Sequence, residues 1–338
     1  MRNNIYNKII LLLFFIFFVT HSFAGEQFNF DVTEIEILEN GNKFIGTKKG
    51  TATSDDGIVI DADRFEYDKK LNILNAKGNV KINDKINKYI IYSDEVIYNK
   101  NNQIIFTINN SRGVSLVDNI IITASDFEYN KNLNLITAKG NVKVKDKDRY
   151  VELYSDYIKY LRNEDQIFTY DNSKAVDLQD SSQITAKDFE YYLKENLFSA
   201  KNNVIVENEI ENYTINTEKI IYYLNEEKII TEGKTSAEVH SKYNFVSENV
   251  TFLKKIMNLS SEKKTTITDK NNLYNLERFN YQINEEQLKG ENIIVSTNYN
   301  QPNSDRFYFS SGIINLKSQN FIAKNTKIKI HNTVFLVG

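Results

Sequence analysis

DADRFEYDKKLNILNAKGNVKI, residues 61–82, is the stretch that decides the fold, because it recurs twice more without gaps. The copies are TASDFEYNKNLNLITAKGNVKV at 123–144 and TAKDFEYYLKENLFSAKNNVIV at 185–206. Weaker copies lie halfway between them, YSDEVIYNKNNQIIFTIN at 92–109 and LYSDYIKYLRNEDQIFTYDN at 153–172, so the true period is 31 residues. A fixed period of this length is typical of stacked repeat architectures.

Six successive units share a tyrosine, and each position around it keeps one class of side chain. Apolar residues stand seven positions before, two before and seven after the tyrosine, and small residues stand five before and nine after. Side chains two apart lie on the same side of a strand, so these pairs predict short strands with one apolar face. The apolar positions and the tyrosines are Ile60, Phe65, Tyr67, Leu74, Ile91, Val96, Tyr98, Ile105, Ile122, Phe127, Tyr129, Ile136, Leu153, Ile158, Tyr160, Ile167, Ile184, Phe189, Tyr191, Phe198, Ile215, Ile220, Tyr222 and Ile229.

Two further features of the repeat predict where the chain bends. The small column and the next apolar column differ in parity, which predicts a bulge or a corner between them. Eleven residues after each tyrosine stands Gly, Asn or Asp, the residues that best tolerate positive φ, and we expect a tight turn there. These six residues are Gly78, Asn109, Gly140, Asp171, Asn202 and Gly233. Because no sustained helical periodicity follows the first 24 residues, the sequence predicts an all-β fold of repeats of about 31 residues.

The chain divides into three predicted parts. Residues 1–24 have the pattern of a cleaved secretory signal peptide, a basic start, an apolar run and small residues before a cut between Ala24 and Gly25; an uncleaved membrane anchor is the alternative. Residues 25–297 form the repeat domain. Residues 298–338 begin with a loop around Pro302 and resume as a further β segment. We expect this segment to continue the domain and to be cut short, because it ends on an apolar run.

Charge and cysteine content exclude several classes of protein. The formal net charge is −3, and loss of the predicted signal peptide removes two basic residues and leaves −5. Nucleic acid is therefore not an expected partner, since no basic excess exists. The absence of cysteine excludes disulfides, a Cys-based metal site and a lipoprotein anchor. The mixed charges Asp146, Lys147, Asp148 and Arg149 predict a solvated turn.

The search for reactive groups predicts no catalytic residue, metal or cofactor. Beyond residue 24 the only histidines are His240 and His331, in unrelated contexts. No nucleophile elbow or phosphate-binding glycine loop is present. The acids that recur in the array, interpreted as solvated turn positions, are Asp63, Asp94, Asp156 and Asp188. An exported β-solenoid enzyme acting on polysaccharides, or a structural or adhesive β-repeat protein, remains the alternative.

The apolar columns admit two interpretations. Stacked repeats place them in continuous stripes, which either fill a closed core or line an open trough between two sheets. A trough would shelter acyl chains from water. The spacing alone does not choose between the two.

The phrases ADRFEY (62–67), LNAKGNVKI (74–82) and LITAKGNVKV (135–144) resemble the OstA-like repeat of lipopolysaccharide transport proteins such as LptA, LptC and the N-terminal part of LptD. The resemblance covers about residues 30 to 295. It implies an antiparallel β-taco, or β-jellyroll, and non-enzymatic transport of lipopolysaccharide through the periplasm to the outer membrane of a Gram-negative cell. The 24 residues named above would then line the lipid groove, with the acyl chains of lipid A inside it.

Within that family the chain is most similar to the periplasmic N-terminal part of LptD, the organic solvent tolerance protein. Two departures are that no barrel-length sequence follows residue 338 and that the cysteines of well-known members are absent. The resemblance implies two kinds of protein partner, other OstA-like domains joined by edge-strand addition and the outer-membrane assembly components. The expected edges are 28–38 and 328–337, which contain no proline to block strand pairing.

Overall fold

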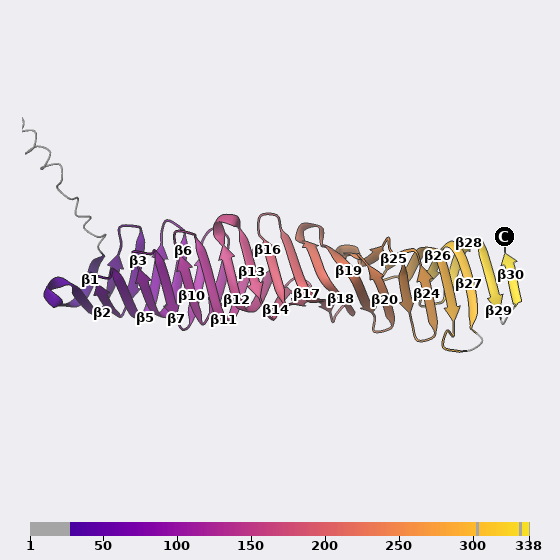
Figure 1. Ribbon diagram of the computed structural model, residues 1–338, viewed down its shortest axis with the longest axis horizontal. Helices are drawn as coiled ribbons and strands as arrows, with labels where there is room; N and C mark the ends of the chain where they lie inside the picture. The colour runs from indigo at the N-terminus through magenta and orange to yellow at the C-terminus, as the bar shows by residue number, and fades with distance from the viewer. Residues whose placement is uncertain (1–27, 302–303, 331–332, 338) are drawn as a thin grey trace, which may run out of the picture.

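The computed structural model describes residues 28–301, 304–330 and 333–337, and the predicted signal peptide and cleavage site at Ala24 and Gly25 lie outside them. The described chain forms a long body in which strands follow one another across the long axis from the N-terminus to the C-terminus (Figure 1). Successive strands pair antiparallel throughout the array. The predicted all-β, repetitive antiparallel fold is confirmed.

Each complete pass of the chain across the body is either one long strand or two short strands in line, and the last described strand is a single short one. The long strands are β1 (Asn29–Leu38), β2 (Lys43–Thr53), β5 (Ile73–Asp84), β6 (Tyr89–Asn99), β11 (Leu135–Asp146), β12 (Val151–Leu161), β17 (Leu197–Asn208), β18 (Tyr213–Tyr223), β19 (Lys228–Val239), β26 (Gln287–Thr297) and β27 (Asp305–Asn315). The short strands are β3 (Ile58–Ala62), β4 (Arg64–Asp68), β7 (Ile104–Ile108), β8 (Ser111–Ser115), β9 (Ile120–Ala124), β10 (Asp126–Asn130), β13 (Gln166–Tyr170), β14 (Ser173–Asp177), β15 (Gln183–Ala186), β16 (Asp188–Tyr192), β20 (Tyr243–Glu248), β21 (Thr251–Leu253), β22 (Asn258–Ser261), β23 (Thr265–Thr268), β24 (Asn272–Leu276), β25 (Arg278–Gln282), β28 (Asn320–Lys324), β29 (Thr326–Ile330) and β30 (Thr333–Val337). Single 3-10 turns lie at Glu39–Gly41, Arg162–Glu164, Leu224–Glu226 and Lys254–Ile256.

Every pass bends near its middle, along a line that we call the crease. In β5 the crease is a bulge, where the register with β6 shifts between Lys77 and Val80. Between β3 and β4 it is a break at Asp63, whose amide donates to the Gly78 carbonyl at 3.0 Å. The crease divides the sheet into two arms that face each other, which is the V shape expected of a β-taco.

The six Gly, Asn and Asp residues expected at tight turns lie on this crease. All six have positive φ, from 56° at Asp171 to 83° at Gly233. The conformation was therefore predicted correctly, but the chain does not reverse there. It kinks and continues across the body, so each position is a corner of the sheet.

The chain reverses instead at two rows of turns, one at the free end of each arm. The row that follows the tyrosine column is called the tyrosine rim, and it comprises the turns 38–43, 68–73, 99–104, 130–135, 161–166, 192–197, 223–228, 253–258, 282–287 and 315–320. The other row is called the aspartate rim, and it comprises the turns 53–58, 84–89, 115–120, 146–151, 177–183, 208–213 and 239–243. We call the gap between the rims the mouth.

Successive turns of one rim are hydrogen bonded to each other through the backbone. On the tyrosine rim the Lys131 amide donates to the Gln103 carbonyl at 2.9 Å, and on the aspartate rim the Leu116 amide donates to the Lys88 carbonyl at 2.9 Å. The backbone bonds recorded for the described turns stay within one rim. The mouth is consequently closed by side chains alone.

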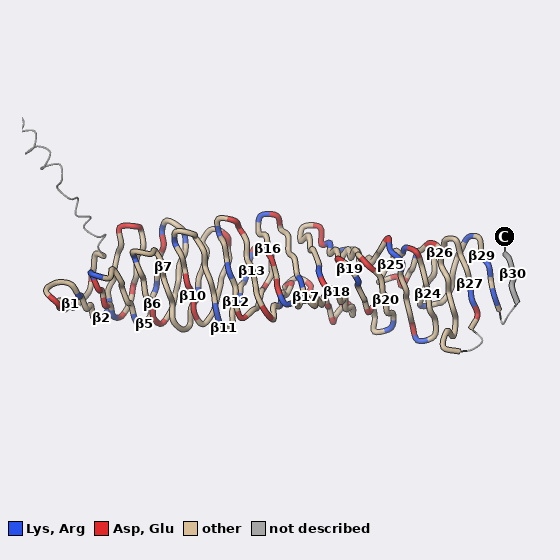
Figure 2. Tube along the Cα trace, viewed as in Figure 1, with Lys and Arg blue, Asp and Glu red and all other residues tan. Residues whose placement is uncertain are grey.

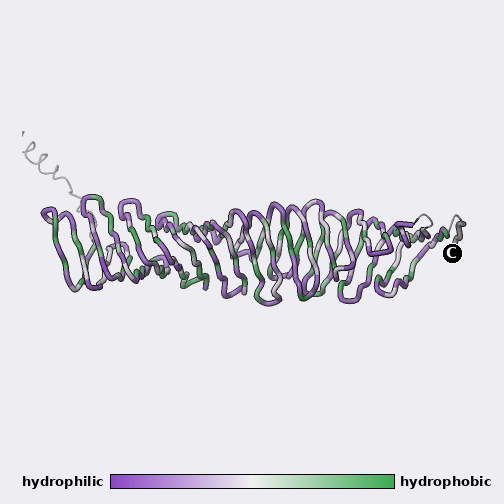
Figure 3. Tube along the Cα trace, turned by 90° about the horizontal axis from the view of Figure 1, so that it is seen from below, coloured by the Kyte–Doolittle hydropathy of each residue, from purple (hydrophilic) through white to green (hydrophobic). Residues whose placement is uncertain are grey.

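Apolar residues gather in the strands and hydrophilic residues at the turns (Figure 3). Acidic and basic residues are interspersed along the whole length (Figure 2). No helix within the described ranges is long and apolar enough to cross a membrane.

The interior is less covered at both ends of the array. Ile35 and Ile37 are 50% and 58% exposed, although they share the inner face with Phe44, the partner of Ile37. Phe321 and Ile330, on the inner face at the other end, are 43% and 40% exposed. Strand β1 pairs only with β2, and β30 only with β29, among the described residues. The expected C-terminal edge, 328–337, thus contains parts of two strands.

Candidate functional site

The 24 predicted groove-lining residues all face the space between the two arms. Each is 7% exposed or less, and together with the small residues beside them they form one continuous apolar cluster. In this closed state the side chains pack against one another. Their role as the lining of a lipid groove stays a prediction.

The cavities found between the arms are small. One cavity of about 20 Å³ is lined by residues such as Val151, Phe198 and Leu224, and another of about 10 Å³ lies beside Phe127 and Ile136. Cavities of this size hold about one water molecule at most. A ligand can occupy the space between the arms only if the arms move apart.

The mouth is closed by a regular series of hydrogen bonds from tyrosine hydroxyls to carboxylates across it. Their donors are the same tyrosines that mark the repeat, and each acceptor lies 42 or 45 residues earlier in the chain. The bonds join Tyr98 to Asp56 at 2.6 Å, Tyr129 to Asp84 at 3.0 Å, Tyr160 to Asp118 at 3.0 Å and Tyr191 to Asp146 at 2.9 Å. The ring of each tyrosine fills the core while its hydroxyl joins the tyrosine rim to the aspartate rim.

The next units continue the closure with different partners. The Lys254 ammonium donates to the Tyr222 hydroxyl at 3.1 Å and to the Asp177 carboxylate and the Ser182 hydroxyl at 2.9 Å each. Further along, Tyr243 on the aspartate rim donates to Glu286 on the tyrosine rim at 2.7 Å. The direction of the bond is reversed there, but the two rims are still joined.

Cations of the tyrosine rim strengthen the closure. Two residues after the tyrosine, Lys100 pairs with Asp55 and Lys131 with Asp56. Arg162 pairs with Asp118 at 3.3 Å and also donates to a backbone carbonyl of the aspartate rim. These cations are mostly buried, whereas their carboxylate partners are more exposed.

The electrostatics of the mouth favour the charged, bonded state. Burial would raise the pKa of Asp56, but hydrogen bonds from Lys131, Ser54 and Tyr98 outweigh it and lower the pKa to about 2. Burial, together with the bond to Asp56, raises the pKa of Tyr98 far above its ordinary value. Burial would lower the pKa of Lys254, but Tyr222 and its carboxylate neighbours raise it instead. The hydroxyls therefore stay protonated donors and the carboxylate stays an acceptor at neutral pH.

The expectation for Asp146 was wrong. This carboxylate, assigned to a solvated turn, is 1% exposed and accepts from Tyr191 and from Arg149. Arg149 also crosses the mouth, donating to the Leu193 carbonyl at 2.7 Å. The repeated tyrosine was visible in the sequence, but its partner was not, because the two residues meet only when both arms are folded.

The recurring acids singled out in the sequence lie elsewhere, along the crease and not at the mouth. Asp63 accepts from the Asn79 amide group at 2.8 Å, and Asp94 accepts from Asn110 at 2.6 Å. Both contacts are local supports of the corner. No group of three or more acidic, histidine or cysteine side chains in the described ranges is placed to bind a metal ion. His240 lies in a turn with positive φ, and His331 is outside the described residues.

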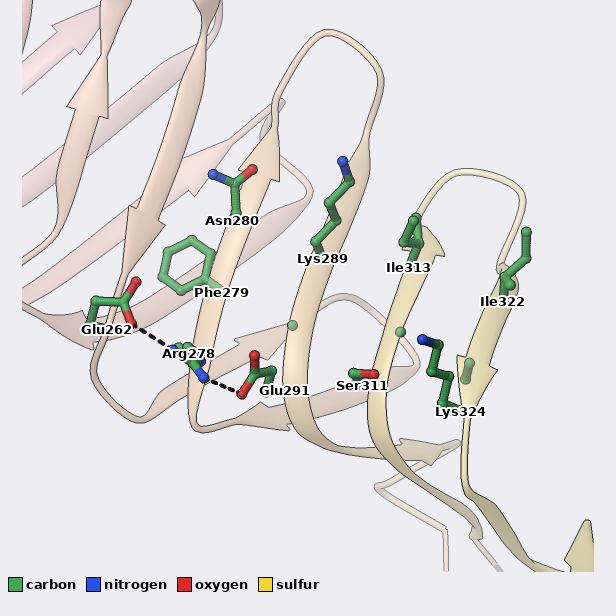
Figure 4. Close-up of a pocket in the computed structure, with 13 residues that line it drawn as sticks. Glu262, Arg278, Phe279, Asn280, Lys289, Glu291, Ser311, Ile313, Ile322 and Lys324 are labelled. Atoms are coloured by element: carbon green, nitrogen blue, oxygen red, sulfur yellow. Dashed lines mark hydrogen bonds and ion pairs between the residues drawn. The ribbon is translucent and has the colours of Figure 1, made fainter. Parts of the chain in front are cut away.

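A separate hollow of about 390 Å³ lies on the outer face of β25 to β28. Asn280, Lys289, Ile313 and Ile322 follow one another across these strands, and Arg278 bridges Glu262 and Glu291 beside them (Figure 4). This hollow is open to solvent, and the buried Phe279 is among the residues that line it.

No family model matches the chain, and no curated protein sequence matches it either. Among solved structures, the chain is similar to LptH from Pseudomonas aeruginosa, described as the LptA homologous periplasmic component of a lipopolysaccharide transport device. The identity is 13%, the match covers 43% of this chain and 82% of that chain, and the TM-score is 0.20. At those values the likeness carries no functional information.

Proposed function

We propose that this protein is a non-enzymatic lipid carrier that shelters acyl chains between its two arms. The observation that supports this most is the apolar interior, which continues from the first rows of the array to Phe309 and Ile314 and is closed on one side by side chains only. A globular core closed by backbone pairing on every side would have no comparable entrance.

The energetics of the interior suit acyl chains. Removing apolar surface from water yields about 25 cal/mol for each Å². An acyl chain that replaces the contacts between the arms keeps this gain, because both surfaces of the opened interior are apolar. The crease supplies the line about which the arms separate, since the chain bends there at residues such as Gly78 and Gly140.

The resemblance of the repeat to the OstA-like repeat indicates which lipid the protein would carry. We infer that the cargo is lipopolysaccharide, with its lipid A acyl chains inside and its saccharide outside the mouth, and that the protein works in the periplasm on the route to the outer membrane. We assign the chain to the OstA-like family and, within it, to the periplasmic part of an LptD-type protein. Other OstA-like domains and the outer-membrane assembly components are the partners that this assignment entails.

Site-specific photo-crosslinking tests the proposal. A photoreactive phenylalanine analogue at Phe127, buried between the arms, is expected to capture lipopolysaccharide in cells. The matched control is Phe106, which is 39% exposed on the outer face of the adjacent strand, opposite Glu128. Equal labelling at both positions would mean that the apolar columns are a closed core and would overturn the proposal.

The enzyme alternative makes a different demand. If the protein cleaves a glycan, and one Asp or Glu substitution abolishes the cleavage while the fold persists, the carrier proposal is wrong. No single carboxylate pair stands out from the repeating ones in the described ranges, so the carrier is the function that we adopt.

A further inference from the structure

A column of side chains was missed in the sequence, and most of its members point into the mouth. It stands two residues after the repeated tyrosine, or after Phe252 in the row of Lys254, and its backbone amide donates to the preceding turn of the tyrosine rim. Its first four members are cationic, the next two are leucines, and the last is again a lysine. The column reads Lys69, Lys100, Lys131, Arg162, Leu193, Leu224 and Lys254.

These cations lie at the boundary between the apolar interior and solvent. The Lys100 and Lys131 side chains are 1% and 7% exposed, and that of Arg162 is 14% exposed. Their ion-pair partners Asp55, Asp56 and Asp118 all belong to the opposite rim. Opening the mouth therefore takes each cation away from the carboxylate that neutralises it.

When an ion pair across the mouth breaks, the carboxylate and the cation differ in the hydrogen bonds that they keep. The acids of the aspartate rim also accept from their own turns: Asp118 accepts from the Ser115 hydroxyl at 2.8 Å, and Asp56 accepts from the Ser54 hydroxyl. They keep these bonds when the arms part. Lys131 and Arg162 make their ion pairs across the mouth, so a mostly buried cation is left to find a new acceptor.

We propose that the cations Lys100, Lys131, Arg162 and Lys254 form a line of binding sites for an anionic headgroup, a phosphate in the first instance, on the lipid that enters the interior. The inference rests on the proposed function and names the headgroup that the same site selects. The headgroup of a lipid whose acyl chains lie inside must sit at the mouth, where these cations are. Its phosphate replaces the carboxylates of the aspartate rim, so the ion pairs are exchanged and not lost.

Two probes with the same acyl chains test the exchange. Dioctanoyl phosphatidic acid and dioctanoylglycerol are titrated below their aggregation concentrations into the full chain after the predicted cleavage site, and heat is measured. We expect phosphatidic acid to bind at least about tenfold more tightly, the effect of one charge-assisted hydrogen bond. Inorganic phosphate alone is the third arm, and it should not bind in the same concentration range because it brings no acyl chain.

Substitutions on the two rims should act in opposite directions. Lys131→Gln with Arg162→Gln eases opening of the mouth for both lipids, but it should lower the preference for phosphatidic acid over dioctanoylglycerol by about tenfold or more. Asp56→Asn with Asp118→Asn should strengthen the binding of phosphatidic acid, because these carboxylates then no longer compete with the headgroup for the cations. Both double substitutions remove ion pairs and lower thermal stability. If these residues had only a structural role, both double substitutions would change the affinity for phosphatidic acid in the same direction. Lys70→Gln with Lys147→Gln, two exposed lysines, is the control for net charge.

The outcomes separate this inference from the proposed function. If both lipids bind equally and neither pair of substitutions discriminates between them, the proposed headgroup sites are wrong, while the proposal that acyl chains bind between the arms stands. If inorganic phosphate binds as tightly as phosphatidic acid, the cations form an ion site unrelated to lipid, and the proposed headgroup sites are also wrong. If neither lipid binds, the proposed function itself fails.

Discussion

At the scale of the residue, the repeated tyrosine has two environments. Its ring packs in the apolar interior, and its hydroxyl reaches the polar boundary at the mouth, as for Tyr129 and Tyr160. The column two positions earlier, with Phe65 and Phe127, lies farther from the mouth and closer to the crease. This difference explains why the repeat keeps tyrosine in one column and phenylalanine, valine or isoleucine in the other.

Removing one hydroxyl should loosen the mouth locally. Tyr129→Phe takes away the donor to Asp84 and should lower the opening free energy of the turns 84–89 and 130–135 by about 1.5 kcal/mol, seen as roughly tenfold faster amide hydrogen exchange there. The matched control is Tyr89→Phe, because the buried Tyr89 hydroxyl has no hydrogen-bond partner and its ring already contacts that of Tyr129. Equal acceleration in the two variants would show that the hydroxyl bond does not close the mouth.

At the scale of the element, the crease shows what a strand needs in order to bend without ending. Gly78 and Gly140 lie inside continuous strands, β5 and β11, at φ of 79° and 76°. A Cβ at Gly78 would meet Asp63 Oδ2 at 2.6 Å, and one at Gly140 would meet Ser125 Oγ at 2.7 Å. Backbone conformation and close packing both require glycine there.

The two requirements can be separated by experiment. Gly233 has the same backbone conformation, φ 83°, but open space where its Cβ would lie. Gly233→Ala should therefore cost only the left-handed backbone, about 1 kcal/mol, while Gly78→Ala should cost at least twice as much because of the contact with Asp63. Local unfolding measured by hydrogen exchange in β19 and β5 compares them. An equal cost at the two sites would mean that Asp63 moves away freely.

Much of this level could be predicted from the sequence. Residue spacing of two identified the inner faces, and all 24 inner residues are buried. Gly, Asn or Asp eleven residues after each tyrosine correctly indicated positive φ. These residues did not indicate whether the chain reverses or only bends, because hairpin turns and mid-strand corners use the same residue types. The closure of the mouth was beyond prediction: Tyr98 and Asp56 are 42 residues apart and meet only through the packing of two arms.

At the scale of the whole molecule, the array has two unequal kinds of surface. Among the described residues, the strands along its length are paired on both sides. At the ends, β1 and β30 are each paired on one side only, and inner apolar side chains such as Ile35 and Ile330 are partly exposed. Exposed apolar residues beside a free strand edge favour association with another chain. The body is thus expected to continue end to end with a similar domain.

End-to-end association should depend on the exposed inner residues of the first strand. Ile35→Asn with Ile37→Asn should reduce concentration-dependent assembly measured by sedimentation velocity, and leave the central rows folded. Ile86→Asn with Ile210→Asn is the control, because these side chains are 69% and 77% exposed but lie on turns in the middle of the body. Association that responds to both pairs alike would be nonspecific, and a strictly monomeric protein would contradict the end-to-end arrangement.

The lack of backbone bonds between the rims has a consequence for how cargo moves. Each stretch of the mouth is held by its own few side chains, and each row is coupled mainly to its neighbours. An opening is therefore a mobile defect: the bonds behind the cargo can re-form while those ahead of it break. The free energy of moving a lipid by one row then depends on the number of rows that are open at one time and not on the length of the array. A longer array therefore costs no more free energy per row crossed than a short one.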